Sequence, residues 1–165
     1  MLTKDKNRRS VCVALLLAAG FALGGEAAAP GWTHASPRDE IAPAFEVAPQ
    51  GGRGGGLGLV IRADGREGLA GRWEKAFSVV GGRYYRFTAY RRAERVALPR
   101  QSVFARVVWQ NDAGKPVPTE EQGPRDLLVG WKPVAEPEFP FDRETDKDGW
   151  TEVSGVYRAP AQATR

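Results

Sequence analysis

The amino-acid sequence predicts an all-β protein built as an antiparallel β-sandwich, and three observations lead to that class. Short runs of alternating apolar and polar residues recur roughly every 10–20 residues, as in sandwich and barrel domains. The 165 residues include 20 Gly and 12 Pro, which gather between these runs at positions typical of turns. An apolar period of 3.6 residues does not persist over any long stretch, so no long amphipathic helix is expected.

The first expected strands lie on either side of a glycine-rich loop. Residues 44–47 form a short strand-like run, and residues 50–56 follow as a flexible loop. The alternation is stronger at residues 57–61, and Asp64-Gly65 is a turn signal that ends this second strand.

The strongest hairpin signal in the chain is Gly81-Gly82. It separates two alternating runs, at residues 73–80 and 83–92. A glycine pair between two such runs is typical of a tight β-turn, so we expect the two runs to pair with each other.

Three further strands are expected in the C-terminal half. Residues 102–110 alternate again and end at a turn over residues 111–114. A short strand is expected at residues 127–131, inside a segment rich in Pro and acidic residues. The last strand is expected at residues 150–159.

Residues 1–29 have the order of a secretory signal peptide. Basic residues come first, an apolar run from Val11 to Leu23 follows, and small residues end the segment. The apolar run is shorter than the ~20 residues that a membrane span needs, which makes a retained anchor the weaker interpretation. We expect cleavage after Ala27, export to the periplasm or the medium, and no membrane span in the mature protein.

The expected mature chain, residues 28–165, has the size of one domain. Its only cysteine, Cys12, leaves with the signal peptide, so no disulfide or Cys metal ligand remains. The peptide also carries more basic than acidic residues, and its removal lowers the formal net charge from +4 to +2. This small charge argues against nucleic acid as a partner.

The C-terminal sequence, residues 161–165, ends where a sandwich of this kind would have one more strand. Either the fold closes in another way, or the chain is the N-terminal part of a longer protein. The second alternative is the one we favour.

The run Gly71–Arg92 combines a strand containing Trp, a Gly turn and a Tyr-rich strand ending in Arg. Together with Trp32 and the segment Gly149–Pro160, it resembles the jelly-roll carbohydrate-binding modules of the galactose-binding-like superfamily. The resemblance implies a jelly-roll sandwich that binds a polysaccharide or other glycan.

The segments Ser36–Ile41, Gly68–Phe77 and Pro99–Val103 are also similar to the N-terminal domains of secreted planctomycete-type proteins, some of which carry a carbon-nitrogen hydrolase domain downstream. This resemblance implies a downstream or partner hydrolase. The hydrolase itself needs a Cys nucleophile, which the mature chain lacks, so this chain alone is not expected to be an enzyme.

The predicted ligand platform is one face of the strand at residues 83–92. Successive side chains of a strand point to opposite faces, so alternate aromatic and arginine side chains share this face. With one residue added from the neighbouring run, the candidate ligand-binding residues are Tyr84, Arg86, Tyr90, Arg92 and Glu74. Sugar-binding modules stack aromatic rings on pyranose faces, and arginine suits sulfated or uronic sugars. The alternative is a solvated sheet face that prevents edge pairing.

Candidate chemistry elsewhere in the chain is weak. Glu144, Asp146 and Asp148 alternate before Gly149 and match a calcium loop in part, which leaves a structural calcium ion as an alternative to an ordinary acidic turn. His34 is the only histidine and no Gly-x-Ser-x-Gly motif accompanies it, so no catalytic triad is predicted. No other cofactor is expected.

Overall fold

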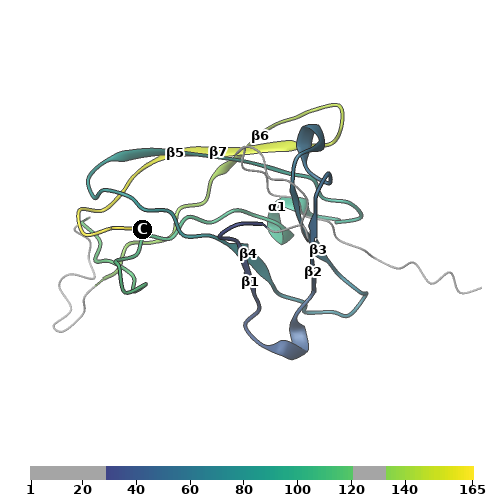
Figure 1. Cartoon of the computed structure of the whole chain (residues 1–165), viewed down its shortest axis with the longest axis horizontal. Coiled ribbons are helices and arrows are strands. Elements are labelled where there is room, and N and C mark those ends of the chain that lie inside the picture. Colours follow the sequence, from purple (N-terminus) through teal and green to yellow (C-terminus); the bar gives the residue numbers. More distant parts are fainter. Residues whose placement is uncertain (1–28, 121–132) are drawn as a thin grey trace, which may run out of the picture. The chain divides into compact units, whose positions relative to one another are not determined.

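The computed structural model describes residues 29–120 and 133–165, and in these residues the protein is mostly β, with small antiparallel sheets and one short helix (Figure 1). Two two-stranded sheets and one three-stranded sheet form among them. The chain divides into two compact units. Unit 1 holds residues up to 75 together with 89–103 and 144–152, and unit 2 holds residues 76–88, 104–143 and 153–165.

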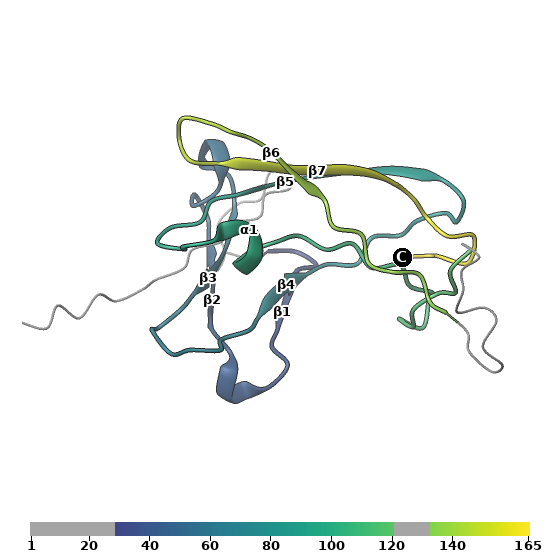
Figure 2. The same cartoon turned by 180° about the vertical axis from the view of Figure 1, so that it is seen from behind.

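Unit 1 contains both two-stranded sheets. Strand β1 (Thr33–Ala35) pairs antiparallel with β4 (Arg72–Glu74), with His34 opposite Trp73. Strand β2 (Ala44–Ala48) pairs antiparallel with β3 (Gly58–Arg62), and the two run side by side in both views (Figures 1 and 2). A 3-10 helix, Asp39–Ile41, precedes β2, and a second one, Arg53–Gly55, lies in the loop between β2 and β3.

Three ring side chains join the two small sheets of unit 1. The His34 ring stacks on Phe45, with ring centroids 4.5 Å apart, and the Trp73 ring lies edge-on to both. The indole Nε1 of Trp73 also donates a hydrogen bond of 3.2 Å to the carbonyl of Val60. Since Val60 and its neighbour Leu59 are buried, this contact fixes β4 against the apolar part of β3.

Unit 2 has its own apolar cluster. Its buried members are Trp109, Val117, Ala159 and Ala163. Partly buried side chains pack around them from several segments: Val79, Tyr85, Val107, Ala135 and Tyr157. Burial raises the pKa of the Tyr157 hydroxyl, and the charge of Glu138 adds to that rise while Arg143 opposes it.

The three-stranded sheet has the order β5-β7-β6, with β7 (Thr151–Arg158) between β5 (Tyr84–Arg91) and β6 (Phe141–Thr145). Within unit 2, Tyr85 of β5 and Tyr157 of β7 both pack on the apolar cluster. Because strand side chains alternate, the residues next to them point to the opposite, outer face.

Several predicted strands are confirmed. The runs at 44–47, 57–61 and 83–92 correspond to β2, β3 and β5, and the run at 150–159 to β7. The turn at residues 111–114 is present: the Gly114 N–H donates to the Asn111 carbonyl at 2.9 Å.

The predicted hairpin at Gly81-Gly82 is wrong. Strand β4 covers only Arg72–Glu74 and pairs with β1, not with β5. The glycines instead approach the C-terminal segment. The Gly82 N–H donates to the Ala159 carbonyl at 2.8 Å, and a Cβ on Gly81 would collide with the backbone of Ala161. The predicted turn itself is present, because the Arg83 N–H donates to the Val80 carbonyl at 3.3 Å across the glycine pair. The turn packs closely on the C-terminal segment instead of joining two paired strands.

The predicted strand at residues 102–110 does not form as a regular strand. Pro99–Ser102 is instead a short helix, α1, and the rest of the segment makes only isolated bridges, Val107 with Glu138 and Gln110 with Pro116. The prediction at residues 127–131 falls outside the described residues, as does the predicted signal peptide.

The C-terminal residues 161–165 pack into unit 2. Ala163 is buried, and the Thr164 N–H donates to the Gln110 carbonyl at 2.9 Å while its own carbonyl accepts from Val79 at 2.8 Å. Gln110 and Arg165 exchange a pair of backbone hydrogen bonds of 2.7 and 3.0 Å. In the part of the chain that the structure describes, no helix is long and apolar enough to cross a membrane.

Candidate functional site

Two of the five predicted ligand residues lie exposed at the start of β5, in unit 2. The Tyr84 side chain is 72% exposed, the largest fraction among the exposed apolar and aromatic residues of the described chain. Arg86 follows two residues later on the same face and is also exposed. Within residues 29–120 and 133–165, Arg86 makes no side-chain hydrogen bond or ion pair.

A second aromatic and arginine pair lies on β6 of the same sheet, and its arginine contacts an outward residue of β7. Phe141 is 56% exposed, and the Arg143 guanidinium lies 5.9 Å from its ring centroid. Arg143 Nε donates a hydrogen bond of 3.2 Å to the hydroxyl of Ser154, on the neighbouring strand β7. Val156 points to the same face of β7 as Ser154 and is exposed.

We call the outer face formed by these residues of unit 2 the arginine–aromatic face. Its members come from β5, β6 and β7: Tyr84, Arg86, Phe141, Arg143, Ser154 and Val156. Both of its aromatic residues stand two positions before an arginine in their strand. The face thus combines exposed rings with guanidinium groups, the two kinds of group that recognise sugars and anionic oxygens.

The other two arginine and tyrosine candidates, Tyr90 near the end of β5 and Arg92 just after it, belong to unit 1, and the structure already gives them partners. The Arg53 guanidinium lies over the Tyr90 ring, 4.1 Å from its centroid. Arg92 lies over the buried Trp150 ring at 5.0 Å, and its Nε is 3.3 Å from a carboxylate oxygen of Glu94. Cation–π contacts of this kind cover part of a ring, so Tyr90 is less available for stacking than Tyr84.

Glu74 is likewise engaged. It lies on β4, opposite Thr33, and its carboxylate accepts a hydrogen bond of 2.7 Å from Arg72 Nε. Both side chains are about half exposed. An exposed pair of this kind contributes little to stability. Within the described residues, the second carboxylate oxygen of Glu74 accepts no hydrogen bond.

The acidic segment before Gly149 forms a turn held by its own middle carboxylate. Asp146 Oδ1 accepts hydrogen bonds from the backbone N–H groups of Asp148 and Trp150, at 3.0 and 2.9 Å. Asp146 Oδ2 accepts from Arg53 Nε at 3.0 Å. The hydrogen bond from Trp150, with Arg53 adding to it, lowers the pKa of the Asp146 carboxyl below its ordinary value.

These contacts bear on the calcium alternative. Among the described residues, no three His, Cys, Asp or Glu side chains gather where they could hold a metal ion. Both carboxylate oxygens of Asp146 already accept hydrogen bonds, and no such bond involves the carboxylates of Glu144 or Asp148 in the described chain.

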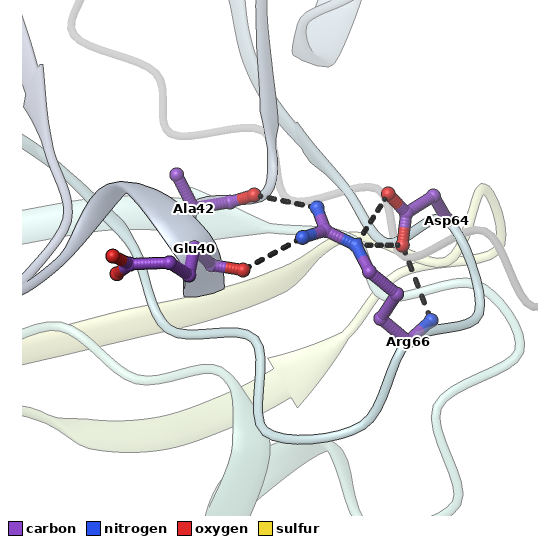
Figure 3. Close-up of polar contacts among 4 residues, drawn as sticks. All are labelled: Glu40, Ala42, Asp64 and Arg66. Carbon is purple, nitrogen blue, oxygen red and sulfur yellow. Dashed lines mark hydrogen bonds and ion pairs between the residues drawn. The ribbon is translucent and has the colours of Figure 1, made fainter.

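Arg66 shows what a structural arginine looks like in this fold. Its Nε donates to both oxygens of Asp64, at 3.0 and 2.9 Å, and its two terminal nitrogens donate to the carbonyls of Glu40 and Ala42, at 2.7 and 3.0 Å (Figure 3). The Arg66 N–H also donates to Asp64, and this bond is the main reason that the pKa of the Asp64 carboxyl is lowered. Every side-chain nitrogen of Arg66 is used within unit 1, in contrast to Arg86.

The residues considered for catalysis or phosphate binding have contacts or conformations that serve the fold. His34 is part of the ring cluster with Phe45 and Trp73. The glycine-rich loop holds a short 3-10 turn in which Gly54 and Gly55 have φ of 66° and 78°, and no long helix follows it. A phosphate cradle needs a helix N-terminus at this place, so the loop shows no sign of one.

Sequence reasoning missed Phe141, Arg143 and Ser154. Residues 115–141 are rich in Pro and acidic residues, a composition that does not predict the short strand β6 beginning at Phe141. A signal was present nonetheless: Phe141-Asp-Arg143 has the same aromatic-x-Arg spacing as Tyr84-Tyr-Arg86.

Comparisons of the chain with family models, with curated proteins and with solved structures gave no match.

Proposed function

We propose that this chain is an exported, non-catalytic carbohydrate-binding module of jelly-roll sandwich type that holds an attached or partner hydrolase near extracellular polysaccharide. The exposure of Tyr84 beside Arg86 is the observation that carries the proposal. An exposed aromatic ring can stack on the apolar face of a pyranose, which removes apolar surface of both partners from water.

The affinity of one such surface is expected to be low. The two rings and two guanidinium groups of the arginine–aromatic face lie on the surface of a sheet, where a bound sugar would stay partly exposed to water. Weak binding of this kind becomes useful through tethering, because an attached hydrolase then stays at a high effective concentration near its polymer.

A second candidate function is a structural domain of a longer secreted carbon-nitrogen hydrolase, with no ligand of its own. Phe104 and Phe139 favour it. They lie in unit 2 with ring centroids 5.9 Å apart, and both are more than half exposed. Two adjacent exposed phenylalanines outside the arginine–aromatic face are suited to contact another protein domain.

Affinity electrophoresis of the purified protein, through gels that contain neutral, uronic or sulfated polysaccharides, distinguishes the two functions. We expect at least one polymer to retard the protein. Tyr84→Ala should weaken that retardation about fivefold, because it removes one stacking ring. Tyr84→Phe keeps the ring and should retain most of the affinity.

Tyr90→Ala is the matched comparison on the same strand. Since Arg53 already covers the Tyr90 ring, we expect a smaller loss of affinity than for Tyr84→Ala. Circular dichroism checks that each variant is folded. A folded protein that no polysaccharide retards would exclude the carbohydrate-binding function and favour the structural domain.

A further inference from the structure

We infer that the arginine–aromatic face binds an acidic polysaccharide, one that carries uronic carboxylates or sulfate esters. The inference rests on the proposed carbohydrate-binding function and names its ligand class. It assigns the contact to four residues of unit 2: Tyr84 and Arg86 on β5, and Phe141 and Arg143 on β6.

The first argument is the state of the two arginines. Arg143 uses its Nε on Ser154 and lies against the Phe141 ring, which holds the side chain in place. Neither of its terminal nitrogens donates to a residue in the described part of the chain, and the same is true of all the nitrogens of Arg86. A guanidinium with free terminal N–H groups binds carboxylate or sulfate oxygens through two parallel hydrogen bonds.

The second argument is that Arg158, which also points outward from β7, already has an acidic partner. Glu120 accepts a hydrogen bond of 2.7 Å from Arg158 and another from the Ala161 N–H, and these contacts lower the pKa of its carboxyl. Arg158, the outward residue at the end of β7, is thereby neutralised. Arg86 and Arg143 keep their positive charge without such a partner among the described residues.

The third argument is the repeated spacing of ring and charge. Tyr84 and Arg86 stand two residues apart on β5, and Phe141 and Arg143 do so on β6. Residues i and i+2 of a strand lie on one face about 6–7 Å apart, which places an anionic group within reach of the arginine while the ring contacts the sugar. The strand β7 separates the two pairs, so each pair suits a different sugar unit of a polymer.

The face suits a glycan better than a nucleic acid or a membrane. The formal net charge of the whole chain is only +4, and +2 without residues 1–27, so no broad basic field is present to attract a polyanion over a long range. Recognition must come from a few well-placed groups, and rings paired with single guanidinium groups provide that.

The test compares each acidic polymer with its neutral counterpart. The purified protein is run through gels containing polygalacturonate or the same polymer fully methyl-esterified, and dextran sulfate or dextran. We expect retardation by an acidic member of a pair and little by its neutral partner. Retardation should weaken as the sodium chloride concentration rises, because salt screens exposed charges.

Substitutions then locate the contact. Arg86→Gln and Arg143→Gln should each weaken retardation about tenfold, since each removes charged hydrogen bonds to the ligand. Arg143→Lys keeps the charge but loses the planar fork and should also weaken it. The control is Arg106→Gln, an exposed arginine of unit 2 outside β5, β6 and β7, which should change it less than twofold.

The outcomes separate this inference from the proposed function. Equal retardation by acidic and neutral members of a pair would overturn the acidic ligand and leave carbohydrate binding intact. Absence of retardation by every polymer would overturn both. If Arg106→Gln weakened binding as much as Arg86→Gln, or if phosphatidylglycerol vesicles or single-stranded DNA bound as tightly as the best polysaccharide, a general attraction to polyanions would replace the inference.

Discussion

The arginine side chains of this protein differ in how many of their nitrogen atoms the fold itself uses. Arg66 donates from all of them to Asp64 and to two carbonyls, whereas Arg86 donates to no described residue. Arg66 lies in the loop after β3 and Arg86 lies within β5, and the sequence alone does not show which of them has tertiary partners. The difference comes from tertiary contacts, since the carbonyls that bind Arg66 belong to Glu40 and Ala42, far away in the sequence.

Asp146 provides a prediction of pH dependence at the level of one residue. Its folded-state pKa lies below the ordinary value of 3.8, so its contribution to stability is fully present above that value. The contribution is lost as the pH falls through the lower, folded pKa. Asp146→Asn keeps an oxygen for the turn but removes the charge, and we expect a lower melting temperature than wild type at pH 7.

The gap in melting temperature between wild type and Asp146→Asn should narrow as the pH is lowered below 3.8, because the wild-type carboxyl is then protonated as well. Thermal melts from pH 7 to pH 2.5 measure this gap. Asp148→Asn removes a charge from the same turn without touching the two hydrogen bonds of Asp146 Oδ1 and should melt close to wild type. A gap that stays constant across this range would contradict the role given to the carboxylate.

At the level of elements, the central strand β7 is the best test of the face assignment. Val153 is 2% exposed and points inward, whereas Val156 is 55% exposed and points to the outer face. Val153→Ala should lower the free energy of unfolding by about 2 kcal/mol, because it removes two buried methyl groups and leaves a cavity. Val156→Ala should change it by less than about 0.5 kcal/mol.

Urea unfolding of both variants, followed by tryptophan fluorescence, measures these differences. The two substitutions are chemically identical and lie in one strand, so strand propensity affects both in a similar way. Equal losses of stability would show that β7 is covered on both faces, and the arginine–aromatic face would then have no room for a polymer.

The strands that sequence predicted correctly are those with a strong local pattern of apolar residues. Strands β5 and β7 contain runs in which apolar and polar residues alternate, and the burial of Val153 beside partly exposed neighbours fits that pattern. Strand β3 is instead a continuous apolar run in which both Leu59 and Val60 are buried. Alternation did not predict which strands pair with each other. Of the alternating run at residues 73–80, only residues 73 and 74 lie in a strand, β4, and that strand pairs with β1 instead of β5.

Only part of the candidate site could be predicted, because alternation shows which residues share a face of one strand but not which strands become neighbours. Alternation along β5 placed Tyr84 and Arg86 on an outward face, and the structure agrees. It could not show that Arg53 covers Tyr90, or that Arg143 of β6 stands on the same outer face as Ser154 of β7. Those facts depend on which strands become neighbours, which a local pattern does not contain.

At the level of the whole molecule, the C-terminal residues 161–165 show the limit of composition as a guide. They are small or polar and have no strand pattern, yet Ala163 is buried and Gln110 pairs with Arg165 through the backbone. Small residues allow such close packing, and the hydrogen bonds are independent of side chains. The apolar cluster of unit 2 is thus completed by a segment that carries no hydrophobic signal.

Export is the whole-molecule property on which the proposed function depends. An extracellular polysaccharide is accessible only to a protein that leaves the cytoplasm, and residues 1–27 are expected to direct that step. Expressed in a bacterial host, the protein should be recovered outside the cytoplasm with Ala28 as its first residue, as determined by mass spectrometry. Leu16→Arg places a charge in the apolar run, and we expect the variant to stay in the cytoplasm with its N-terminus uncleaved. Recovery of the unmodified protein in the cytoplasm, with residues 1–27 still attached, would remove the basis for an extracellular ligand.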